Sequence, residues 1–129
     1  MKRFFLTNVV LVIAFFYAMP DVAWSHAFPE HAEPGAGAAL TTVLTQVQIR
    51  FDRELEPVFS TLRVEDGKGM RVDNGDSHLV PGQSSLLQVS LKPLTAGVYH
   101  VFWTAVARDG HRTEGDYTFT VKELSLAID

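Results

Sequence analysis

Residues 98–106 limit the fold most strongly, because apolar side chains alternate along both sides of this segment. One face would carry Tyr99, Val101, Trp103 and Ala105, and the other Val98, His100, Phe102, Thr104 and Val106. A period of two residues is that of a β-strand, and two largely apolar faces are typical of a strand inside a fold. The segment therefore predicts a central strand of an all-β domain.

Shorter segments of the same kind predict the rest of the domain. In residues 43–51 the apolar face would carry Val43, Thr45, Val47, Ile49 and Phe51. The other predicted strands lie at 60–65, 70–72, 86–91 and 117–121, with an edge strand and a loop in 26–40 and a mobile loop at 73–85. About seven short strands, joined by turns and without a helical pattern, predict a seven-stranded Greek-key β-barrel or immunoglobulin-like sandwich.

The first 25 residues predict a secretory signal peptide. A basic start precedes an apolar run at 4–19, and Ala23 and Ser25 have the small side chains that a signal peptidase reads. The run is short for a membrane span, which needs roughly 20 apolar residues, and no later stretch is apolar for long enough. Cleavage after Ser25 predicts a secreted protein, not itself membrane-spanning, whose single domain at 26–129 begins with His26.

Composition excludes several classes of function. Removing residues 1–25 leaves 9 basic and 14 acidic residues, a net charge of −5 with neutral histidines, which argues against nucleic acid as a partner. The chain has no cysteine, so disulfides, thiolate catalysis, zinc–thiolate sites and iron–sulfur clusters are excluded. Met70 is the only methionine after residue 25, so a thioether cluster for Cu(I) is excluded as well.

A histidine at a free N-terminus offers a metal ion two donors, its α-amine and its ring Nδ1. A second candidate is Asp109-Gly110-His111, which falls in a predicted tight turn between two strands. Such a loop is a common place for a site, although the tripeptide alone is weak evidence and by itself favours an ordinary surface turn. Taken with His26, it completes a nitrogen-rich set with one carboxylate, which suits Cu(II), while Ni(II) and Zn(II) would bind more weakly.

The sequence from residue 26 onward resembles the periplasmic copper-binding proteins of the CopC type. Shared features are the His26-Ala27 start, a loop rich in Pro, Gly and Ala at 34–38, and a strand-ending Phe with a charged turn and a Phe-Ser pair at 51–60. The shared positions near the C-terminus are Leu94, Gly97, Tyr99, Val101, Trp103, Asp109, His111, Gly115 and Phe119. Each motif alone is weak, but together they are specific and cover essentially the whole domain.

The resemblance implies a non-enzymatic, immunoglobulin-like β-barrel that holds one Cu(II) ion. Its ligands would be His26, through amine and ring, with Asp109 and His111. It also implies a role in copper resistance and homeostasis, in which copper is sequestered in the periplasm and delivered to an inner-membrane partner of the CopD type. Many family members have a glutamate where this chain has Arg53, so Asp52 or Glu54 takes over as an outer-shell acid or the role is absent.

Two other functions compete with this prediction. An N-terminal histidine with a second histidine is also the copper brace of oxidative polysaccharide monooxygenases, although this chain is small and lacks an evident flat aromatic surface. The other alternative is an immunoglobulin-like domain that binds a protein partner and no metal. Among the remaining histidines, His31 would be an exposed loop residue or an additional ligand, while His78 and His100 are not expected to bind metal.

Overall fold

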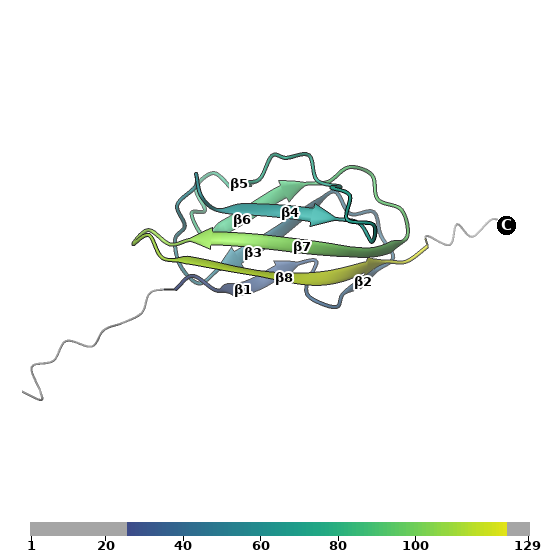
Figure 1. The fold of residues 1–129 in the computed structure, drawn as a ribbon, viewed down its shortest axis with the longest axis horizontal. Coiled ribbons are helices and arrows are strands. Elements are labelled where there is room, and N and C mark those ends of the chain that lie inside the picture. The colour runs from purple at the N-terminus through teal and green to yellow at the C-terminus, as the bar shows by residue number, and fades with distance from the viewer. Residues whose placement is uncertain (1–25, 124–129) are drawn as a thin grey trace, which may run out of the picture.

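The computed structural model describes residues 26–123, which form two four-stranded sheets packed face to face (Figure 1). One sheet has the order β1 (Pro29–Glu33), β3 (Gln46–Phe51), β6 (Leu86–Ser90) and β5 (His78–Leu79). The other has the order β2 (Ala39–Leu40), β8 (Arg112–Val121), β7 (Gly97–Val106) and β4 (Thr61–Glu65). The predicted all-β sandwich is confirmed, and the predicted signal peptide lies outside the described residues.

The core lies between the inward faces of the two sheets. Fully buried side chains alternate along β3 and β7, at Val47, Ile49, Phe51, Val101 and Ala105. The Phe51 ring meets the Trp103 ring edge-on at 5.4 Å, and Tyr99 stacks on Phe119 at 5.5 Å. Aromatic pairs of this kind add about 0.5–1.5 kcal/mol each to the stability that burial provides, which matters in a chain without disulfides.

The predicted central position of residues 98–106 is also confirmed, because β7 lies between β8 and β4. Its outward face is only partly exposed. The His100 ring stacks on the Phe102 ring at 4.1 Å, and the Arg63 guanidinium lies 4.6 Å from the centroid of Phe102. These contacts explain why both faces of the strand carry large side chains.

Several predicted boundaries are wrong. β3 begins at Gln46, and Val43 lies before it with 77% of its surface exposed. The expected strand at 70–72 is reduced to a single bridge between Glu65 and Arg71. With the strand at 70–72 lost, two unpredicted strands of only two residues, β2 and β5, bring the number to eight. Pairing that short leaves no periodic pattern in the sequence.

β8 begins at Arg112, well before the predicted start at residue 117. Gly115 interrupts the apolar alternation there, and the interruption has a packing reason. The Trp103 indole lies against Gly115, its partner in the β7–β8 ladder, so that a Cβ atom at Gly115 would stand 2.6 Å from Cζ2 of Trp103. The glycine makes room for the tryptophan, so β8 continues through it.

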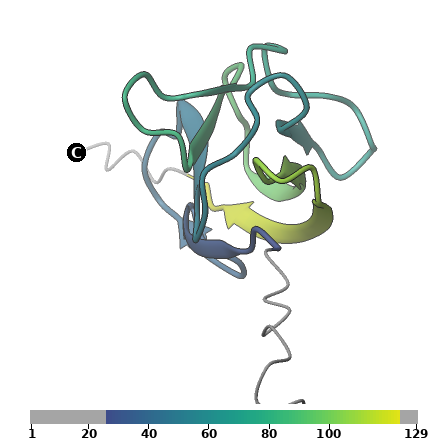
Figure 2. The ribbon, with the colours of Figure 1, turned by 90° about the vertical axis from the view of Figure 1, so that its left-hand side faces the viewer.

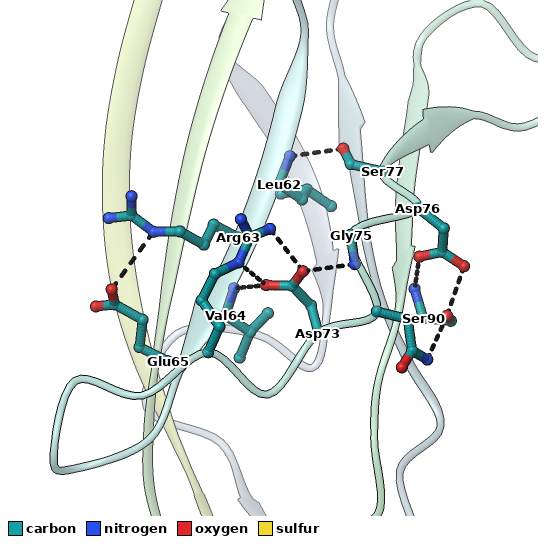
Figure 3. Close-up of polar contacts among 11 residues, drawn as sticks. Leu62, Arg63, Val64, Glu65, Asp73, Gly75, Asp76, Ser77 and Ser90 are labelled. Atoms are coloured by element: carbon teal, nitrogen blue, oxygen red, sulfur yellow. Dashed lines mark hydrogen bonds and ion pairs between the residues drawn. The ribbon is translucent and has the colours of Figure 1, made fainter.

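The segment 73–85, predicted to be a mobile loop, instead carries β5 and a buried carboxylate. Asp73 is 3% exposed and accepts hydrogen bonds from the backbone N–H groups of Val64 and Gly75, both at 2.9 Å (Figure 3). The guanidinium of Arg71 donates to the same carboxylate at 2.7 Å. This polar cluster ties the segment to β4.

β4 is an edge strand, and side chains take the place of a further neighbouring strand along it. Besides the contact to Asp73, the Leu62 N–H donates to Oγ of Ser77 at 2.7 Å. Asp76 reaches the other sheet, where it accepts from the backbone N–H of Ser90 at 2.8 Å (Figure 3). The segment 73–77 therefore closes one open side of the sandwich and satisfies an edge that would otherwise be free to pair.

Asp73 predicts how stability depends on pH. Burial alone would raise the pKa of its carboxyl, but hydrogen bonds from Arg71, Val64 and Gly75 outweigh burial and hold the pKa below its ordinary value. Stability from a carboxyl of lowered pKa is complete above the unfolded pKa, about 3.9, and is lost as the pH falls through the folded pKa. We expect the free energy of unfolding to fall steeply below about pH 4.

The variant Asp73→Asn tests this assignment by chemical denaturation at several pH values. It should be less stable than the wild type at pH 7 by about 1–3 kcal/mol. As the pH is lowered below about 4, its free energy of unfolding should fall less than that of the wild type. Glu30→Gln, which removes an exposed carboxylate, is the matched control and should leave the wild-type profile in place. If Asp73→Asn keeps the wild-type acid dependence, the carboxylate is not the responsible group.

Candidate metal centre

One end of the sandwich brings the start of the described chain beside the β7–β8 hairpin, and Figure 2 looks onto this end. The ring centroids of His26 and His111 lie 5.4 Å apart. Nδ1 of His111 lies 3.0 Å from Oδ2 of Asp109, and the His111 backbone N–H donates to Oδ1 of Asp109 at 3.1 Å. The structure therefore brings the three predicted ligands to one end of the fold.

The hairpin turn has the local structure that its sequence predicts. The Gly110 N–H donates to the carbonyl of Ala107 at 2.9 Å, and the Ala107 N–H donates to the carbonyl of His111 at 3.0 Å. Gly110 has a φ of 89°, a conformation that residues with a Cβ rarely adopt. The glycine thus closes a turn tight enough to keep Asp109 and His111 in contact.

The three side chains meet in pairs. His26 lies against His111, and His111 is bonded to Asp109; within residues 26–123, no group of three or more His, Asp or Glu side chains forms a preassembled metal site. The α-amine that cleavage would free at His26 is a fourth donor that is not a side chain. The side chains of His111 and Asp109 are 53% and 36% exposed, so an ion can reach them from solvent.

The segment that follows His26 is held at three points. Ala27 is fully buried, and its carbonyl accepts a hydrogen bond from Oγ1 of Thr113 at 2.5 Å. The Phe28 N–H donates to Oδ1 of Asp52, and the Asp52 N–H donates to the Phe28 carbonyl, both at 2.9 Å. Sequence reasoning missed Thr113, although an apolar alternation continued backwards from Tyr117 would have placed its side chain on the inward face of β8.

An open cavity of about 610 Å³ adjoins Asp109 and contains the predicted outer-shell acids. Asp52 and Glu54 both line it, together with Arg53. Asp52 is bonded to Phe28, while Glu54 pairs with Arg108 at 3.2 Å. Of the two acids, Asp52 is the one tied to the His26 segment.

The other three histidines have partners of their own. His31 lies on β1 rather than in the expected loop, and its Nε2 is 2.8 Å from Oε1 of Glu33. Nδ1 of His78 lies 2.6 Å from the carbonyl oxygen of Asp76. His100 pairs with Asp116 through Nε2 at 2.5 Å, on the outward face of β7.

Across residues 26–123, no helix is long and apolar enough to span a membrane.

Comparison with known proteins gives one consistent result. The sequence model of the CopC domain matches residues 29–122, which includes Asp109 and His111 and begins just after His26. The copper transport protein CutJ of Bacillus subtilis is 28% identical over 113 residues, 87% of this chain but only 21% of CutJ. The copper resistance protein C of Escherichia coli is 33% identical over 107 residues, covering 78% of this chain and 84% of that protein.

Solved structures agree with the sequence matches. The crystal structure of CopC from Methylosinus trichosporium OB3b superposes with a TM-score of 0.70 at 30% identity, over 75% of this chain and 94% of that one. The match by sequence and the match by fold therefore point to one family. The chain belongs to the CopC domain family.

Proposed function

We propose that this protein binds one Cu(II) ion per chain and carries it in the periplasm as part of copper resistance and homeostasis. The ligands are the α-amine and ring of His26, the ring of His111 and the carboxylate of Asp109. The observation that carries the proposal is the approach of the two histidine rings, 5.4 Å between centroids, from opposite ends of the domain sequence.

The chemistry of this donor set supports Cu(II) over other ions. Imidazole and amine nitrogens with one carboxylate suit its tetragonal geometry, and Cu(II) is at the top of the divalent affinity order. The soft ligands that favour Cu(I) are lacking at this site. The chain has no cysteine. Met70 follows the end of β4, which pairs with the start of β7, so Met70 lies at the opposite end of the sandwich from the β7–β8 hairpin. We therefore propose one site, specific for the oxidised ion.

The proposed role is carriage, with no catalytic step. A carboxylate at the metal fills a position that oxygen-activating copper chemistry needs open. The exposed position of His111 and Asp109 suits uptake and release at the protein surface. An inner-membrane copper transporter of the CopD type is the proposed recipient; the match to part of CutJ, a longer protein named for copper transport, supports this direction.

Thermal unfolding with and without metal tests the proposed function. A ligand that binds only the folded state stabilises it by about 2.7 kcal/mol at a free concentration one hundred times Kd, which raises Tm by roughly 10 °C in a domain of this size. We expect such a rise with Cu(II) at pH 7 and a smaller one with Zn(II). Because protons compete for amine and imidazole donors, the rise should vanish toward about pH 4–5. No rise with Cu(II) at pH 7 would show that the domain does not bind the ion.

A further inference from the structure

We infer that Thr113 and Asp52 are positioning residues, which hold the N-terminal histidine beside His111 so that both can bind one metal ion. The inference rests on the proposed Cu(II) site and adds two residues that are not among the proposed ligands. Its basis is the set of contacts that fixes Ala27 and Phe28 immediately after His26.

Thr113 links the two ligand-bearing segments directly. Its Oγ1 donates to the carbonyl of Ala27 at 2.5 Å. Ala27 is the residue after His26, and Thr113 is two residues beyond His111. One hydrogen bond therefore joins the backbone next to one proposed ligand to the strand that begins directly after the other, across 86 positions of sequence.

Asp52 fixes the same segment from the other sheet. It follows the last residue of β3, and it bonds Phe28 twice, with its side chain to the Phe28 N–H and with its own N–H to the Phe28 carbonyl, both at 2.9 Å. The second of these bonds continues the β1–β3 pairing past Pro29 and Phe51. The first bond is made by a carboxylate, where a regular ladder would use a backbone carbonyl.

A bulge in β1 explains why the chain needs these anchors. Pro29 pairs with Phe51 and His31 with Arg50, so Glu30 is an extra residue in the ladder. A bulge redirects a strand and breaks its regular pairing. On the N-terminal side of the bulge, Ala27 is buried at 0% exposure, and the contacts of Ala27 with Thr113 and of Phe28 with Asp52 hold the redirected segment in place.

The consequence for binding is preorganisation. A terminal residue is ordinarily mobile unless it is tied down, and a chelate formed by a mobile residue loses conformational freedom on binding. With Ala27 and Phe28 fixed, His26 has little freedom left. Groups that hydrogen-bond the metal ligands themselves typically contribute 10–100-fold to metal affinity, and we expect these anchors, one or two residues from the ligand, to contribute at the lower end of that range.

The test measures Cu(II) affinity by competition with a chelator, together with the electron paramagnetic resonance spectrum, on the exported protein. Thr113→Val removes the hydroxyl and keeps the shape, and it should weaken Cu(II) binding about tenfold or more and broaden the spectrum. Thr113→Ser keeps the hydroxyl and should restore wild-type affinity. Asp52→Ala should weaken binding in the same way as Thr113→Val.

Tyr117→Phe is the matched control. Tyr117 lies on the same strand as Thr113, and its hydroxyl donates to the Pro34 carbonyl at 2.9 Å, at the far end of β1. It should reduce stability as Thr113→Val does, yet leave affinity and spectrum unchanged. If Tyr117→Phe weakens Cu(II) binding as much as Thr113→Val does, the effect reflects general stability, and the inference is overturned.

The inference and the proposed function fail in different ways. If the wild type binds Cu(II) tightly and Thr113→Val binds it equally well with the same spectrum, the inference is wrong and the proposed function stands. If the wild type does not bind Cu(II), the proposed function itself is wrong, and the inference falls with it.

Discussion

A single alanine added ahead of His26 is expected to weaken Cu(II) binding more than any outer-shell change, by more than about 100-fold. The addition turns the proposed amine ligand into an amide, which is a poor donor at neutral pH, while every side chain stays in place. The protein is prepared by removing a tag so that its first residue is defined, and Kd is measured by chelator competition.

His78→Ala is the control for the extension. His78 is exposed on β5, and its ring nitrogen already contacts the Asp76 carbonyl. Affinity should be unchanged in this variant. Equal losses in the extended protein and in His78→Ala would remove the amine from the ligand set.

The second large effect is expected from His111→Ala. It removes one proposed ring ligand and should also cost more than about 100-fold in Cu(II) affinity. Because the His111 side chain is 53% exposed and lies in a turn, the stability of the metal-free protein should change by no more than about 0.5 kcal/mol. A loss of Cu(II) affinity in His111→Ala without a loss of stability would identify His111 as a ligand rather than a structural residue.

His31→Ala is the matched control for His111→Ala. His31 is the other histidine near the beginning of the domain, and in the structure it pairs with Glu33 on β1. Unchanged Cu(II) affinity in His31→Ala supports a site without it. A loss as large as that of His111→Ala would place His31 among the ligands and contradict the proposed set.

The sequence predicted the parts of the fold that have a long regular period. Both β3 and β7 follow from alternation, because one or both faces of each strand are apolar over many residues. The ordered structure of residues 73–85 was not predicted from the sequence, because it depends on the single carboxylate of Asp73 and on backbone groups that belong to β4. A polar segment held by hydrogen bonds has the same composition as an unstructured loop.

The candidate site, like the fold, could be predicted from the sequence only in part. The turn at Asp109-Gly110-His111 can be predicted because its glycine and its position between strands are local features. That His26 joins this turn was predicted from the chemistry of the combined donor set and was supported by the resemblance to a family. The role of Thr113 was hidden, because its partner is a backbone carbonyl far away in the sequence, and no side-chain pattern marks such a contact.

The proposed function requires that export frees the amine of His26 and that this amine, with its own ring, binds the ion. The most direct measurement is the intact mass of the exported protein, followed by Cu(II) titration of that sample under electron paramagnetic resonance. We expect a mass that places His26 at the N-terminus, and one equivalent of Cu(II) in a nitrogen-rich environment. An exported protein that keeps residues before His26 and still binds Cu(II) with undiminished affinity would contradict the account.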